Sequence, residues 1–151
     1  MLHFSNSQFA IRNSVWPYAV AAFLSLVGLA DAIYLTVERI SGRSVQCTVI
    51  AGCSEVLGSS YAQVGSVPLA ALGALAYFSA FSLATLAGFG YKLAHPLFTF
   101  LISAMFLVTL WLLYLQAFVI HAFCQFCLLS AAVTTGLAVT ALLAFRGKKR
   151  G

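Results

Sequence analysis

The residues of this chain best suited to chemistry are four cysteines, which fall into two closely spaced pairs. Cys47 and Cys53 are separated by five residues, and Cys124 and Cys127 by two. Thiol–disulfide exchange needs an attacking thiolate, an accessible sulfur and a second thiol that resolves the mixed disulfide. Cysteines three positions apart share a helix face, so Cys124 and Cys127 supply both thiols within one turn. The sequence therefore predicts a dithiol redox centre at this pair.

Cys124 begins the last long apolar run of the chain, so we expect it at the N-terminus of a helix. The positive end of the helix dipole and the unpaired N–H groups there both favour the thiolate, which is the nucleophilic form. Cys47 and Cys53 lie on a separate polar segment, where Gly52 gives the backbone freedom to bring the two sulfurs together. This pair can exchange electrons with the first where the two segments meet.

The elements that must position these cysteines are membrane helices. Of 151 residues, 62% are hydrophobic and only 7% are charged, whereas soluble domains carry about 25% charge. We expect an all-α integral membrane protein, a single domain over residues 1–151 that forms a bundle of four transmembrane helices. The expected spans, each long enough to cross a bilayer, are residues 16–37, 68–89, 97–119 and 124–145. The polar segment 38–67 should cap the bundle as an extracytoplasmic loop with a short half-helix at residues 54–57.

The basic residues indicate how the bundle is oriented. The formal net charge of +5 comes largely from residues 146–150, and no basic face that suits nucleic acid is present. Four spans place both termini on one side with Arg12, Lys92 and this basic tail, and the positive-inside rule makes that side cytoplasmic. The redox loop and Cys124 then face the opposite, periplasmic side, so all four cysteines reach one oxidising face.

Two thiol pairs at a bilayer surface need an electron acceptor, and the sequence contains no haem, flavin or nucleotide motif. A quinone dissolved in the membrane is the available two-electron acceptor, and we expect it to enter between the helices next to Cys127. The side chains of Phe118, Phe123 and Phe126 are candidates to line this pocket, although ordinary packing is an alternative for each. His121 is a candidate to stabilise a thiolate or to donate to a quinone carbonyl, or else it faces lipid headgroups.

One acidic residue, Asp31, interrupts the first apolar run. A carboxyl group inside a membrane span is costly, so the default interpretation is functional. The alternative is that Asp31 lies close to the outer interface.

The ordered set of motifs resembles the vitamin K epoxide reductase family, in its bacterial disulfide-forming branch. The resemblance covers about Leu26 to Phe145 and is far more specific than a lone CxxC. It rests on Cys47-x5-Cys53, the following Ser-Glu-Val-Leu-Gly-Ser59-Ser-Tyr, Val67-Pro68-Leu69-x-x-x-Gly73 and Cys124-x2-Cys127.

This resemblance implies a multi-pass protein of the bacterial inner membrane, with four helices around a quinone, that drives oxidative protein folding. Cys124 and Cys127 would be the active-site pair, with Cys127 closest to the quinone. Cys47 and Cys53 would be the shuttle pair that takes electrons from a partner. Ser59 would be tied to the active site by hydrogen bonding. The expected partner is a separate periplasmic thioredoxin-like (DsbA-like) protein.

The chain departs from the mammalian members of this family at the quinone site. Ala131 stands where they carry a tyrosine, and the opening turn of the second span contains no asparagine. We therefore expect ubiquinone or menaquinone as the cofactor, rather than reduction of vitamin K epoxide.

Several alternatives stay open at the level of sequence. The cysteines are consistent with inert structural disulfides in a non-enzymatic membrane scaffold, with packed thiols or with a four-thiolate zinc site. The five-residue gap between Cys47 and Cys53 is long for a zinc knuckle, so we predict no metal. A DsbB-like quinone oxidase of a different family has the same chemistry, but its CxxC lies in the first half of the chain.

Overall fold

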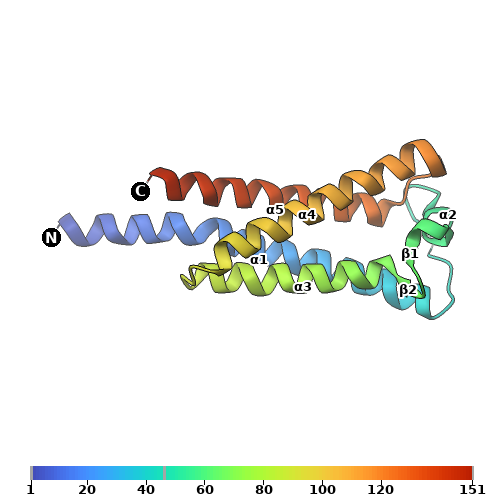
Figure 1. Ribbon diagram of the computed structural model, residues 1–151, viewed down its shortest axis with the longest axis horizontal. Coiled ribbons are helices and arrows are strands. Elements are labelled where there is room, and N and C mark those ends of the chain that lie inside the picture. The colour runs from blue at the N-terminus through green and yellow to red at the C-terminus, as the bar shows by residue number, and fades with distance from the viewer. Residues whose placement is uncertain (1, 46, 151) are drawn as a thin grey trace.

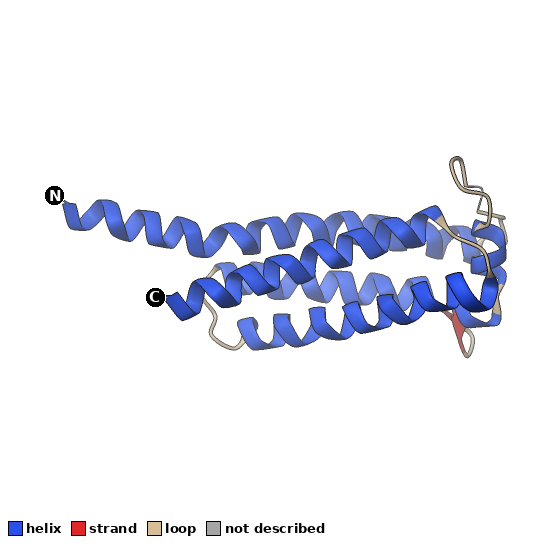
Figure 2. Ribbon diagram, turned by 90° about the horizontal axis from the view of Figure 1, so that it is seen from above, coloured by secondary structure: helices blue, strands red, loops and turns tan. Residues whose placement is uncertain are grey.

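A computed structural model describes the backbone of residues 2–45 and 47–150 and the side chains of residues 15–45 and 47–149. Four long helices lie side by side and form a bundle (Figure 1 and Figure 2). Their bounds are α1 Leu2–Ile40, α3 Leu69–Gly88, α4 Ala94–Tyr114 and α5 Gln125–Arg150. The chain of α4 continues without a break into a π-helix, η2 Leu115–Ile120. Within this arrangement α1 packs against α3 and α5, and α4 packs against the same two helices.

All four helices are long and apolar enough to cross a membrane. The candidate spans are Val15–Ile40, Leu69–Gly88, Ala94–Ile120 and Gln125–Lys149. Large apolar side chains such as Phe23, Leu75, Phe100 and Leu107 point outward from the bundle, as a lipid-facing surface requires. The prediction of an all-α bundle of four transmembrane helices is confirmed.

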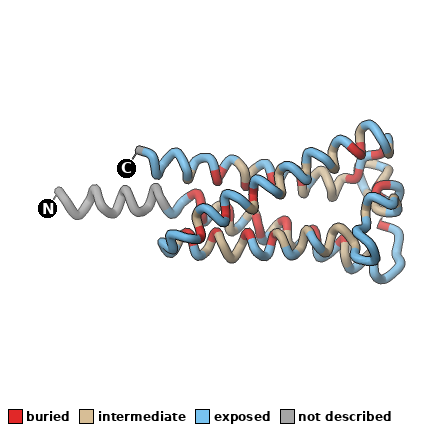
Figure 3. Tube along the Cα trace, viewed as in Figure 1, coloured by how far each residue is buried: buried red, intermediate tan, exposed pale blue. Residues whose placement is uncertain are grey.

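Small residues allow the helices to approach closely. Ala21 of α1 and Ala80 and Ala84 of α3 are completely buried, and small side chains at such positions permit backbone contact in membrane proteins. Buried positions occur where helices face one another, and exposed positions cover the outward faces (Figure 3). Gly28 of α1 lies directly against the ring of Tyr77, where a Cβ atom would overlap the ring. The absence of a side chain at Gly28 therefore leaves the space that the Tyr77 ring occupies.

The segment between α1 and α3 forms the expected cap over one end of the bundle (Figure 1). It contains a short helix, α2 Cys53–Gly58, a 3-10 turn, η1 Ser60–Ala62, and a two-stranded hairpin, β1 Gln63–Val64 with β2 Val67–Pro68. Gly52 precedes α2 with a φ of 139°, and a Cβ atom there would lie 2.8 Å from the carbonyl oxygen of Phe123. Only glycine fits this close approach between the cap and the segment before α5.

The two ends of the bundle differ in charge. The start of α1, the end of α5 and the α3–α4 turn lie together at the end opposite the cap (Figure 1). Lys92 of that turn and Arg146, Lys148 and Lys149 of α5 all belong to this end, whereas Arg12 lies outside the residues whose side chains are described. The cap end instead carries Glu38, Arg39, Arg43 and Glu55, a balanced set.

Candidate dithiol redox site

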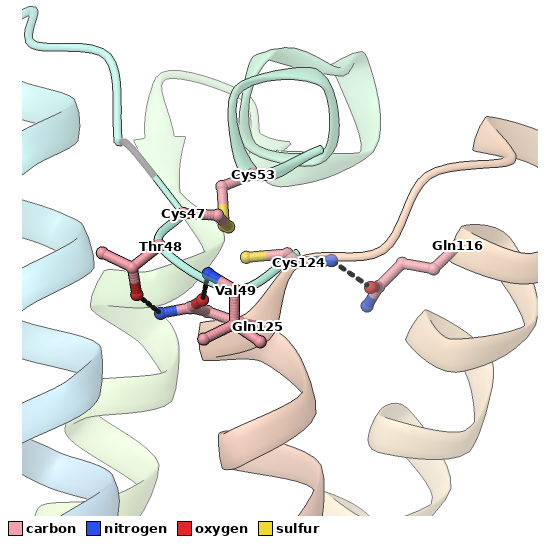
Figure 4. The surroundings of a disulfide bond; sticks show 7 residues. All are labelled: Cys47, Thr48, Val49, Cys53, Gln116, Cys124 and Gln125. Carbon is pink, nitrogen blue, oxygen red and sulfur yellow. Dashed lines mark hydrogen bonds between the residues drawn. A yellow bond between two sulfur atoms is a disulfide. The ribbon is translucent and has the colours of Figure 1, made fainter. Parts of the chain in front are cut away.

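The sulfurs of three cysteines meet beneath the cap. Cys47 and Cys53 form a disulfide with a Cα–Cα distance of 5.7 Å. The Sγ atoms of Cys47, Cys53 and Cys124 all lie within 4.8 Å of one another. Cys124 is a free thiol, and its sulfur points toward the disulfide (Figure 4). The predicted convergence of the two cysteine pairs is therefore present in the fold.

The surroundings of Cys124 favour its thiolate. Cys124 immediately precedes α5, and the backbone N–H groups of Phe126 and Cys127 donate to its sulfur. The pKa of the Cys124 thiol is lowered from its ordinary value of 9.0 to about 7, mainly by the side-chain hydrogen bond from Cys127. Burial opposes this shift, and the two backbone donors support it. A reactive thiolate at this helix N-terminus is what the sequence predicts.

A glutamine that the sequence analysis missed holds the backbone of Cys124. Gln116 lies in η2, is only 3% exposed, and accepts a hydrogen bond from the Cys124 N–H through its Oε1 atom at 3.1 Å. The bond satisfies a buried donor just before the first turn of α5, where backbone N–H groups lack helical partners. A polar amide inside an apolar span was the available signal for this residue.

A second glutamine, located between the two cysteines of the CxxC motif, holds the redox loop. Gln125 accepts a hydrogen bond from the Val49 N–H at 3.0 Å, and its Nε2 atom donates to the Thr48 hydroxyl at 3.4 Å (Figure 4). Thr48 directly follows Cys47, so these two bonds fix the loop beside its disulfide. Gln125 thus connects the start of α5 to the segment that carries the disulfide.

The two loop cysteines differ in accessibility. Cys53 is 1% exposed and packs with Cys124, which is fully buried. Cys47 is only half-buried, although both loop cysteines line a shallow outer pocket with Ser44 and Ser54. A macromolecular partner therefore has easier access to Cys47 than to the other two sulfurs.

A cavity of about 440 Å³ lies below the cap, between the four helices. Aliphatic side chains such as Leu69, Leu101, Met105 and Leu112 form most of its wall, and Cys127 lies on it. The volume is within the range of small-molecule sites, which are mostly apolar with a few placed polar groups. A quinone ring fits the size and the apolar character of this cavity.

Buried polar side chains of the cavity wall are mostly paired with one another. The Tyr77 hydroxyl lies 2.7 Å from the Ser130 hydroxyl and 2.9 Å from the Thr134 hydroxyl. Ser59 lines the cavity too, and its hydroxyl donates to the Val56 carbonyl at 2.7 Å, within the cap. The hydrogen bond described for Ser59 therefore stabilises the end of α2 and does not reach a cysteine.

Four side chains predicted to line the quinone pocket are not part of the wall of this cavity. The cavity-lining residues include Cys127 but not Phe118, His121, Phe123 or Phe126. Phe118 is 67% exposed, and Phe126 packs on Tyr34 with ring centroids 5.2 Å apart. Phe118 lies within the π-helix η2, and His121 directly follows this helix with a left-handed backbone at a φ of 55°. Most of the cavity wall is instead aliphatic, and its polar residues include Tyr77, Asp31 and Arg39.

Comparison with known proteins agrees with this geometry. The sequence model of the vitamin K epoxide reductase family matches residues 19–142, a range that contains all four cysteines and the cavity-lining residues. The cysteine motifs indicate the same family. The chain therefore belongs to the vitamin K epoxide reductase family, a family of membrane oxidoreductases.

Proposed function

We propose that this chain is one membrane domain that acts as a quinone-dependent thiol oxidoreductase. Electrons pass from a partner's dithiol to Cys47 and Cys53, then to Cys124 and Cys127, and finally to a quinone. The observation that carries this proposal is the continuity of the site. Cys124 lies within 4.8 Å of both loop sulfurs, and its neighbour Cys127 lines the apolar cavity.

The first exchange uses the accessible loop cysteine. A thiolate of the partner attacks Cys47, which forms a mixed disulfide and releases Cys53 as a thiolate. The second thiol of the partner then resolves the mixed disulfide. The partner leaves with a disulfide, and the loop retains two electrons as a dithiol.

The second exchange takes place between the two cysteine pairs. The Cys53 thiolate attacks Cys124 of an oxidised Cys124–Cys127 pair, and Cys47 resolves the resulting bond. The loop disulfide is restored, and Cys124 and Cys127 become a dithiol. The structure has this arrangement of bonds, with a Cys47–Cys53 disulfide beside two free thiols.

The cavity supports a quinone as the final acceptor. A bound quinone accepts two electrons and two protons, which is what a dithiol loses when it becomes a disulfide. Cys127 lies on the cavity wall, together with Asp31 and Ala131. Ala131 offers no hydroxyl to the ligand, which supports ubiquinone or menaquinone rather than a vitamin K epoxide.

The distribution of charge supports an orientation. The basic residues of the α3–α4 turn and the end of α5 lie opposite the cap, so the positive-inside rule places them in the cytoplasm. The cysteines then face the periplasm of a bacterial inner membrane. The partner is a separate thioredoxin-like (DsbA-like) protein, which passes its disulfide to exported proteins.

The test is quinone reduction by the protein purified in detergent, with a reduced thioredoxin-like donor and with ubiquinone-1 or menadione. We expect Cys127→Ala to abolish turnover. Ser79→Ala is the matched control, because its exposed hydroxyl bonds only the Leu75 carbonyl of its own helix, and it should keep wild-type activity. A wild-type protein that reduces neither quinone would contradict the proposal and favour a disulfide-stapled scaffold.

A further inference from the structure

Asp31 is the buried acidic side chain that the exchange steps above do not use. It lies in α1 within a membrane span, is 8% exposed and forms part of the cavity wall. Cys127 lies on the same wall. The first span therefore contributes a carboxyl group to the cavity in which the quinone is proposed to bind.

The Oδ2 atom of the Asp31 carboxyl group is buried and has no hydrogen bond to any described residue. Arg39, two turns along α1, instead lies against the side-chain amide of Gln63 in the cap. The one ion pair among the described side chains joins Arg43 to Glu38. A buried carboxyl left without a partner is costly, so a structural role does not account for it.

Other buried polar groups of the cavity wall differ from Asp31 in this respect. The Tyr77 hydroxyl bonds Ser130 and Thr134, and Gln116 bonds the Cys124 backbone. Because these groups are satisfied within the protein, the partner that Asp31 lacks is best supplied by the occupant of the cavity. A carboxyl group can donate to a quinone oxygen and accept from a quinol hydroxyl.

We propose that Asp31 is a catalytic residue that hydrogen-bonds the bound quinone and moves a proton at its Oδ2 atom, an inference that rests on the proposed function. The dithiol of Cys124 and Cys127 releases two electrons and two protons as its disulfide forms. Formation of a quinol takes up two of each. Asp31 adds no net proton, because Oδ2 gives one to the ligand and regains one that leaves the dithiol.

Two substitutions separate binding from proton transfer. Asp31→Leu removes the hydrogen bond and should weaken binding of ubiquinone-1, measured by equilibrium dialysis in detergent, about tenfold. Asp31→Asn keeps a hydrogen-bonding side chain of the same size but cannot exchange a proton. It should bind ubiquinone-1 within a few-fold of wild type and lose about 100-fold or more in turnover.

Two measurements other than turnover test whether the Asp31 carboxyl group contacts the bound quinone. Labelling of the Asp31 carboxyl by dicyclohexylcarbodiimide, followed by mass spectrometry, should be suppressed by excess ubiquinone-1. Removal of an unpartnered buried carboxyl should leave the thermal midpoint of Asp31→Leu equal to or above that of wild type. A residue with a structural role would lower the midpoint when replaced.

Glu38→Gln is the matched control, because Glu38 is an acidic residue of the same helix that pairs with Arg43 outside the cavity. It should change neither ubiquinone-1 binding nor turnover. Ubiquinone-1 affinity of Asp31→Leu within twofold of wild type, or full turnover by Asp31→Asn, would overturn the role of Asp31 and leave the proposed function standing. A wild-type protein that reduces no quinone would instead overturn the proposed function, and this inference with it.

Discussion

Replacement of Gln125 by leucine should uncouple the redox loop from the CxxC motif while all four cysteines stay in place. Leucine has a similar volume but cannot bond Val49 or Thr48. The bond to the Val49 N–H, at 3.0 Å, has good geometry, whereas the one to the Thr48 hydroxyl, at 3.4 Å, is long. Both are exposed to water, so together they contribute about 1 kcal/mol to the docked loop. This free energy corresponds to roughly a fivefold lower ratio of docked to undocked loop.

The assay starts from protein with an oxidised Cys124–Cys127 pair and one equivalent of reduced partner. Samples are quenched with acid at short times, and free thiols are labelled with a mass-tagged maleimide. The expected result for Gln125→Leu is a slower transfer of electrons from the loop pair to the CxxC pair, by up to about fivefold. Hydrogen exchange supplies an independent readout, because the Val49 amide should lose protection in the variant.

Two further variants test whether the effect of Gln125→Leu comes from its hydrogen bonds to the loop. Thr48→Val removes only the longer bond and should slow transfer less than twofold. Gln63→Leu is the matched control, because Gln63 lies in the same cap but faces Arg39 rather than the cysteines. If Gln125→Leu exchanged at the wild-type rate although its Val49 amide had lost protection, a docked loop would not be needed for transfer, and the reasoning would fail.

Three other changes follow from the same site. Because the pKa of Cys124 is lowered to about 7, its thiolate should form as pH rises through 7 and be lost below it. Cys127→Ala removes the hydrogen bond that is the main cause of the lowered pKa. The midpoint of the pH titration of Cys124, followed by the ultraviolet absorbance of its thiolate, should therefore move to higher pH. Cys124→Ala supplies the blank for this absorbance. Gln116→Leu leaves the buried Cys124 N–H without its acceptor and should lower the free energy of unfolding by about 1–3 kcal/mol, measured by denaturant titration. Gly52→Ala should destabilise the cap by about 1–3 kcal/mol, seen as faster reduction of the Cys47–Cys53 disulfide by dithiothreitol. Gly42→Ala is the control, because Gly42 also has a positive φ, 68°, but open space around it. It should accelerate reduction of the disulfide less than Gly52→Ala does. Equal acceleration by the two variants would argue that the contact with Phe123 is not the cause.

The parts of this structure that could be predicted from sequence follow from the bilayer. A membrane allows few spanning structures, so four apolar runs of sufficient length specify four helices and the side on which each loop lies. That constraint alone brings Cys47 and Cys124 to the same end of the bundle, although they are far apart in the chain. The start of α5 directly after Cys124 is likewise a local property of the apolar residues that follow it.

The lining of the cavity could not be predicted in this way, because it depends on rotation of the helices about their axes. Phe118 and Phe123 lie close to the CxxC motif in sequence, yet both are exposed. A π-helix accommodates more residues per turn than an α-helix, so η2 shifts the face that each of its residues presents. His121 then reverses the backbone with a positive φ. Neither feature has a signature in the pattern of apolar residues.

Gln116 and Asp31 illustrate the difference between a buried polar residue with a hydrogen-bond partner in the protein and one without such a partner among the described residues. Each lies in an apolar span, where a polar group is costly, but the sequence analysis used this signal only for Asp31. What each residue does depends on its partner. Gln116 bonds the Cys124 backbone, so its cost is offset within the protein. The Oδ2 atom of Asp31 has no partner among the described residues and lies at the wall of the cavity that contains Cys127. Because hydrophobic surroundings strengthen any hydrogen bond that a ligand makes there, the group that is costly to the fold is also the one best placed to act on the proposed quinone.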